Sequence, residues 1–110
     1  MSRSFKTITP AEFAERAARG ERVRLIDVRE PVEFELARVE GAELLPMSRF
    51  NEWAGRLGDP AEEIVVMCHH GVRSAQVCSA LAYAGFTNLH NLAGGIDRWS
   101  DEVDPSVPKY

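Results

Sequence analysis

The feature that most constrains the fold is a short apolar run, IVVMC, at residues 64–68. Every position in this run is apolar, so it has no polar face to turn toward water. A strand that is apolar on both faces is typical of the centre of a parallel sheet that is covered by helices. Five residues are far too few to span a bilayer. The run therefore predicts a buried central strand.

Strand and helix signals alternate on both sides of this run. Thr9 is a typical N-cap for a helix that ends before Gly20, with Pro10 at its first position and Glu12 as the reciprocal capping partner. Other segments predict strands at 23–28, 43–45 and 87–92, and helices near 33–36, 49–57, 74–83 and 95–103. This alternation predicts an α/β fold, with a central parallel sheet of about five strands flanked by helices on both faces.

Length and charge narrow the class of protein. The 110 residues fit a single domain, 1–110, and its tail at 104–110 contains two prolines and is expected to be loose. The net charge is -4 and the pI about 5.4, which disfavours a binder of the nucleic-acid backbone. The segment from Met1 to Lys6 lacks the apolar run of a signal peptide. We therefore expect a cytoplasmic protein that has no membrane or nucleic-acid partner.

The chain has two cysteines, Cys68 and Cys78, and no C-x-x-C pair. Two thiols in a cytosolic chain are more often free or catalytic than joined in a disulfide. Cys78 has helical spacing to Leu81 and Ala82, which favours core packing over a role as a resolving thiol. Cys68 is different, because it ends the apolar strand. The carboxyl ends of strands are where open α/β sheets bind ligands.

The segment from Cys68 to Ser74 runs directly from this strand into a helix. A tight turn of this kind points backbone N–H groups toward the sulfur, and the helix adds the positive end of its dipole. Gly71 supplies an unusual backbone angle, and Arg73 supplies a positive charge near the helix start. These features predict an anion cradle in which Cys68 reacts as the thiolate.

Two anion chemistries fit such a cradle: oxyanion transfer, as in a small phosphatase or arsenate reductase, and sulfane sulfur transfer. Four residues separate Cys68 from Arg73, namely His69, His70, Gly71 and Val72. Oxyanion enzymes of this shape usually have five. The smaller ring therefore favours one extra sulfur atom. Two adjacent histidines in a tight turn rarely bind one ion together, so we expect no metal.

Four segments together resemble the single-domain rhodanese (thiosulfate sulfurtransferase-like) family over nearly the whole chain. Each matches a family motif, in the family's order and spacing: DVREPVEF at 27–34, GAELLP at 41–46, CHHGVRS at 68–74 and LAGGIDRW at 92–99. In the last of these, Gly94 and Gly95 are interpreted as the turn that lets the final helix dock.

The resemblance implies a ping-pong sulfurtransferase with a persulfide on Cys68 and no cofactor. It assigns substrate binding to the rest of the loop: His69, His70, Gly71, Val72, Arg73 and Ser74. Asp27 and Arg29 are expected to support the site, most simply as an ion pair that braces the loop. The expected substrates are a small sulfur donor and acceptor. A sulfur-carrier protein and a cysteine desulfurase are candidate partners, because the tail is similar to those of rhodanese domains fused to adenylating enzymes.

Two alternatives remain open: a partner-docking module that delivers sulfur for cofactor or tRNA thiolation, and the oxyanion enzyme. The chain also departs from some thiosulfate-using relatives, which carry a basic residue where Glu33 stands. A carboxylate there repels a dianion, so this residue disfavours thiosulfate as the physiological donor. The sequence names neither the donor nor the acceptor.

Overall fold

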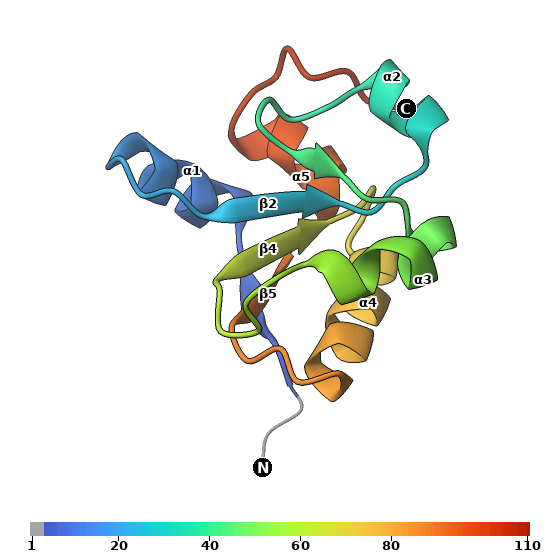
Figure 1. The fold of residues 1–110 in the computed structure, drawn as a ribbon. Coiled ribbons are helices and arrows are strands. Elements are labelled where there is room, and N and C mark those ends of the chain that lie inside the picture. The colour runs from blue at the N-terminus through green and yellow to red at the C-terminus, as the bar shows by residue number, and fades with distance from the viewer. Residues whose placement is uncertain (1–3) are drawn as a thin grey trace.

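The computed structural model describes residues 4–110, and within them one sheet forms the centre of the fold (Figure 1). Its five parallel strands lie in the order β1-β5-β4-β2-β3. Their bounds are β1 (Lys6–Ile8), β2 (Arg24–Asp27), β3 (Glu43–Leu44), β4 (Ile64–Met67) and β5 (Leu89–Leu92). The apolar run predicted to be central is β4, in the middle of this order, and each of its residues is buried. The predicted parallel α/β fold is confirmed.

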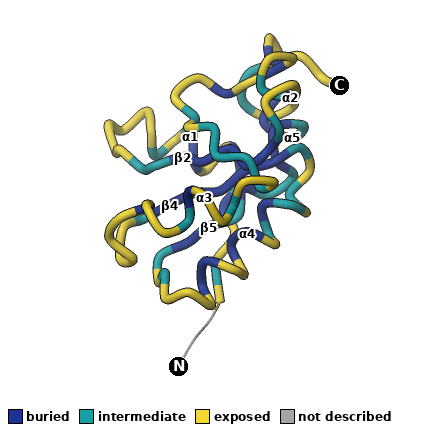
Figure 2. The backbone as a smooth tube through the Cα atoms, turned by 45° about the vertical axis from the view of Figure 1, so that its right-hand side comes forward, coloured by how far each residue is buried: buried dark blue, intermediate teal, exposed yellow. Residues whose placement is uncertain are grey.

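Helices cover both faces of the sheet, as expected. Their bounds are α1 (Pro10–Ala18), α2 (Pro31–Leu36), α3 (Phe50–Trp53), α4 (Val72–Tyr83) and α5 (Gly95–Glu102), with 3-10 turns at Met47–Arg49 and Ala54–Arg56. Side chains of α3 and α4 pack with Ile64 and Val66 on one face, and side chains of α1 and α5 pack with Val65 and Met67 on the other. The alternating directions of β4 side chains thus explain why the strand is apolar throughout. Buried chain gathers along the central strands, and exposed chain lies in the outer loops (Figure 2).

The structure corrects some of the predicted elements. Strand β1 was not predicted; its three residues carry little local signal, and it forms by pairing with β5. The helix predicted at 49–57 is a short α-helix between two 3-10 turns. The helix predicted from Ser74 begins earlier, at Val72, because Gly71 precedes it as an N-cap at φ 104°. Val72 and Arg73 therefore belong to the first turn of α4.

The tail is not loose, although it lacks regular structure. Val107 is buried, and its carbonyl oxygen accepts a hydrogen bond of 2.7 Å from the hydroxyl of Ser100 on α5. This anchor holds the segment that follows against the body of the domain. Among residues 4–110, no helix is both long and apolar enough to cross a membrane. The expectation for the leader segment falls partly on residues 1–3, outside the described residues, and the cytoplasmic location stays a prediction.

Candidate active site

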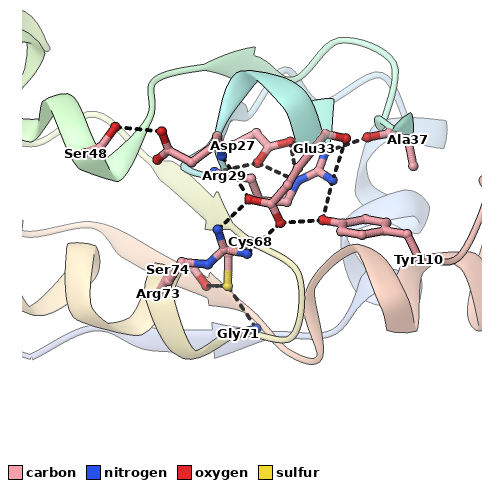
Figure 3. A network of polar contacts seen from close by, with 11 residues as sticks. Asp27, Arg29, Glu33, Ala37, Ser48, Cys68, Gly71, Arg73, Ser74 and Tyr110 are labelled. Atoms are coloured by element: carbon pink, nitrogen blue, oxygen red, sulfur yellow. Dashed lines mark hydrogen bonds and ion pairs between the residues drawn. The ribbon is translucent and has the colours of Figure 1, made fainter. Parts of the chain in front are cut away.

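Cys68 lies at the carboxyl end of β4, where the chain turns into α4, and it is 1% exposed. Two donors reach its sulfur (Figure 3): the Gly71 amide at 3.0 Å and the Ser74 hydroxyl at 3.2 Å. Gly71 adopts a left-handed backbone conformation that a side chain rarely tolerates, and this conformation turns its amide back toward Sγ. The loop thus provides a polar cradle for the sulfur, made by Gly71 and Ser74.

Asn91 on β5 holds two members of this cradle, and no sequence motif indicated it. Its Nδ2 donates to the Gly71 carbonyl at 3.0 Å, which leaves its Oδ1 facing the Ser74 hydroxyl at 2.5 Å. A hydroxyl has one proton. Ser74 can therefore donate either to Asn91 or to Sγ, and a negatively charged sulfur is the stronger acceptor. A polar residue near the carboxyl end of the strand beside β4 was the available signal.

The start of α5 fixes the other side of the loop. The amide of Ile96 donates to the carbonyl of Cys68 at 2.9 Å, and the amide of Asp97 donates to that of His69 at 3.1 Å. A Cβ atom on Gly95 would overlap the Cys68 carbonyl oxygen and lie 2.5 Å from that of His69. Gly95 therefore permits the close docking of α5 that was expected of the Gly94–Gly95 turn.

The charge of Arg73 is paired rather than free. Its Nη1 and Nη2 donate to the two carboxylate oxygens of Glu33 at 2.6 and 2.9 Å. Hydrogen bonding to Arg73 is the main cause that lowers the pKa of Glu33 from 4.5 to about 2, so Glu33 remains ionised at neutral pH. The same pair raises the pKa of Arg73. An anionic ligand therefore meets a neutralised ion pair where the sequence suggested a free cation.

Asp27 and Arg29 form the expected ion pair, and both side chains are fully buried. Nη2 of Arg29 lies 2.7 Å from a carboxylate oxygen of Asp27. The same guanidinium donates to the carbonyls of Glu33 and Ala37 and to the Tyr110 hydroxyl. The pair therefore supports the rim that α2 forms above the site, and its hydrogen bonds do not run directly to the Cys68 loop.

The two histidines of the loop take different positions. His69 is stacked between His70 and Tyr110, with ring centroids 3.9 Å apart in each case. Burial, followed by the nearby His70, lowers the pKa of His69. Ligand atoms of His69, His70 and Asp97 lie within 4.8 Å of one another. The nitrogen lone pairs of two stacked rings, however, lie in separate planes and do not converge on one point. Asp97 is in addition paired with Lys109. The geometry does not favour a metal, and its absence stays a prediction.

The remaining residues of interest are Val72 and Cys78. Val72 is 68% exposed on the first turn of α4, so it can contact a substrate or partner but does not line the sulfur cradle. Cys78 packs in the core below the loop, where burial raises the pKa of its thiol to about 12. A thiol that remains protonated is a poor nucleophile. Core packing of Cys78 is thus confirmed.

Known proteins share this sequence and fold. A family model for the rhodanese-like domain matches residues 9–102. The chain is 38% identical over 105 residues to the probable adenylyltransferase/sulfurtransferase MoeZ of Mycobacterium tuberculosis, covering 94% of this chain and 27% of that relative. It is 34% identical over 96 residues to the thiosulfate sulfurtransferase GlpE of Haemophilus influenzae, covering 87% of this chain and 89% of GlpE.

Solved structures give the same result. A rhodanese-like domain protein from Staphylococcus aureus superposes with a TM-score of 0.81 at 28% identity, covering 96% of this chain and 98% of that one. The human single-domain sulfurtransferase TSTD1 superposes with a TM-score of 0.74 at 27% identity, covering 87% and 96%.

Proposed function

The chain belongs to the rhodanese-like domain family, and we propose that it is a sulfurtransferase that carries sulfane sulfur as a persulfide on Cys68. The observation that carries this proposal is the placement of Sγ at a strand end, between the Gly71 amide and the Ser74 hydroxyl. These donors sit within hydrogen-bond reach of a sulfur that must carry negative charge before and after the transfer.

The proposed reaction has two half-reactions. In the first, the Cys68 thiolate attacks the sulfane sulfur of a donor, a new S–S bond forms, and the donor's own bond to that sulfur breaks. The leaving group departs with the electron pair, as sulfite from thiosulfate or as a thiolate from an alkyl persulfide. In the second, a nucleophilic acceptor attacks the outer sulfur of the persulfide and restores the Cys68 thiolate. No redox cofactor is needed, because electrons balance within each step.

The cradle suits a persulfide better than a tetrahedral oxyanion. Only four residues separate Cys68 from Arg73, and the Arg73 guanidinium is bound to Glu33. A bound phosphate would need several donors and an unpaired cation around its oxygens. A single terminal sulfur needs room for one atom. We therefore place the phosphatase and arsenate reductase alternatives behind sulfur transfer.

Sulfur delivery to a protein partner is the second candidate function. Relatives named as joint adenylyltransferase and sulfurtransferase proteins, in Mycobacterium tuberculosis and in Zea mays, match nearly the whole chain. In this proposal the acceptor is a sulfur-carrier protein or the donor is a cysteine desulfurase. It uses the same Cys68 persulfide, so both candidate functions predict the same first half-reaction.

Intact-mass measurement tests the shared step. After incubation with thiosulfate or a cysteine-desulfurase donor, the protein should gain about 32 Da, one sulfur atom, and lose it again on addition of cyanide. Cys68→Ser should gain nothing, and Cys78→Ala serves as the matched cysteine control that still gains sulfur. Wild-type protein that takes sulfur from neither donor would refute the sulfurtransferase proposal, and turnover of a phosphate ester would then favour the oxyanion enzyme.

A further inference from the structure

Tyr110 lies beside the site and makes three contacts there, of which Figure 3 shows the two made by its hydroxyl. Its ring stacks on His69 at 3.9 Å between centroids and 9° between planes. Its hydroxyl accepts a hydrogen bond from Arg29 Nη1 at 2.8 Å and donates one to Glu33 Oε2 at 2.8 Å. The buried Val107 anchors the tail that carries this residue. Tyr110 thus joins the loop that follows Cys68 to the charged rim of the site, which consists of the Asp27–Arg29 and Glu33–Arg73 ion pairs.

The hydroxyl of Tyr110 holds the Glu33 carboxylate against the Arg73 guanidinium. Burial raises the pKa of Tyr110 above its ordinary value, so the hydroxyl keeps its proton and remains a donor to Glu33 at neutral pH. Glu33 consequently accepts from Arg73 on both oxygens while Tyr110 holds Oε2 in place. With the buried Asp27–Arg29 pair, the rim carries two positive and two negative charges. It offers no net positive charge to a ligand.

A rim of this kind discriminates by charge. Thiosulfate is a dianion that must give up strong hydration on entry, and it finds no unpaired cation in exchange. An alkyl persulfide, R–S–SH or R–S–S⁻, has at most one charge on its sulfur and loses less hydration. The stacked ring also covers His69, whose Nε2 is buried and has no hydrogen-bond partner within residues 4–110.

We propose that Tyr110 is a specificity-determining residue, which disfavours thiosulfate and favours alkyl persulfides as sulfur donors by holding Glu33 on Arg73. The inference rests on the proposed sulfurtransferase function. With the favoured donor, the Cys68 thiolate attacks the outer sulfur of R–S–SH, the donor's S–S bond breaks, and RS⁻ leaves with the electron pair. The proton stays on the transferred sulfur or is lost to water.

The test compares loading rates for thiosulfate and for cysteine persulfide in Tyr110→Phe, which keeps the ring and removes the hydroxyl. The variant loses both hydrogen bonds of the hydroxyl, the one from Arg29 and the one to Glu33. Loss of the bond that holds Glu33 should raise kcat/KM for thiosulfate about five- to tenfold, mainly through a lower KM. The rate with cysteine persulfide should change less than about twofold. Tyr83→Phe, an exposed tyrosine at the far end of α4, is the matched control and should change neither rate.

A second measurement does not depend on sulfur transfer. Iodoacetate and iodoacetamide are similar in size and differ in charge, and both alkylate thiolates. In Tyr110→Phe the rate of Cys68 alkylation by iodoacetate, relative to iodoacetamide, should rise several-fold. In Tyr110→Ala, which also removes the stacked ring, both reagents should react faster.

The outcomes separate the two proposals. Equal acceleration of both donors in Tyr110→Phe, or no change with thiosulfate, overturns the role of Tyr110 in specificity while leaving sulfur transfer intact. An unchanged ratio of the two alkylation rates does the same. If no donor loads sulfur on Cys68 in wild type or variants, the sulfurtransferase function fails, and the alkylation ratio still decides whether Tyr110 excludes anions.

Discussion

Glu33→Gln is the sharpest probe of the rim, because it removes one charge and keeps the shape of the side chain. Glutamine has nearly the same shape, and like glutamate it can accept the hydrogen bond that the Glu30 amide donates to Glu33 Oε1 at 3.0 Å. The start of α2 should therefore stay formed. The charge is lost, and so are the hydrogen bonds that Arg73 Nη2 and Tyr110 donate to Oε2, because an amide has a single acceptor oxygen.

The size of the effect follows from the pKa of Glu33. A fall from 4.5 to about 2 corresponds to about 3.5 kcal/mol, at about 1.4 kcal/mol per pKa unit. The side chains of Arg73 and Glu33 are 30% and 17% exposed, so solvent screening lowers our expectation to about 1–2 kcal/mol. The folded pKa lies below the unfolded one. This stability is therefore present above about pH 4.5 and is lost as the pH falls toward about 2.

Urea unfolding of wild type and variant across this pH range measures the effect. At about pH 7 the variant should be less stable by about 1–2 kcal/mol, and near pH 2 the difference should shrink toward zero. Glu35→Gln, at an exposed position on the same helix, is the matched control and should show little difference at either pH. A stability gap for Glu33→Gln that is the same at both pH values would refute the reasoning, because the lost interaction would then not be ionic.

Two further variants test how the loop is held. Gly95→Ala places a Cβ against the carbonyls of Cys68 and His69 at a left-handed backbone position, so we expect a loss of about 2–4 kcal/mol in urea unfolding and slower sulfur loading. A stable variant with normal loading would show that α5 does not need this close approach. Asn91→Ala removes the amide that orients Ser74, and we expect loading to slow about three- to tenfold in single-turnover mass measurements. Normal loading there would remove Asn91 from the positioning machinery.

Local sequence patterns were sufficient for much of the fold. The apolar run at 64–68 identified the central strand, because only a strand covered on both faces can be apolar at each position without exposing those side chains to water. The Thr9 capping box placed the start of α1, where both reciprocal hydrogen bonds form. Signals of this kind lie within a few residues of each other, so they can be read without the fold.

Strand β1 and the role of Asn91 could be recognised only from the tertiary structure. The first is a strand because its backbone pairs with β5, some eighty residues away in the chain. The second matters because β5 lies beside β4, which brings its amide to Gly71 and Ser74. No local pattern encodes such a neighbour.

The sequence by itself identified the proposed sulfur carrier: Cys68 at a strand end, separated from Arg73 by four residues, with a glycine in the turn and a helix directly after. Only the tertiary structure decided the charge around that sulfur. Glu33 and Tyr110 lie forty and thirty-seven residues from Arg73, and folding brings both to the rim, where one neutralises the arginine and the other holds that pair in place. The electrostatic field at a site is the sum over charges that are neighbours in space. A sequence motif can therefore identify the candidate nucleophile without determining the field around it.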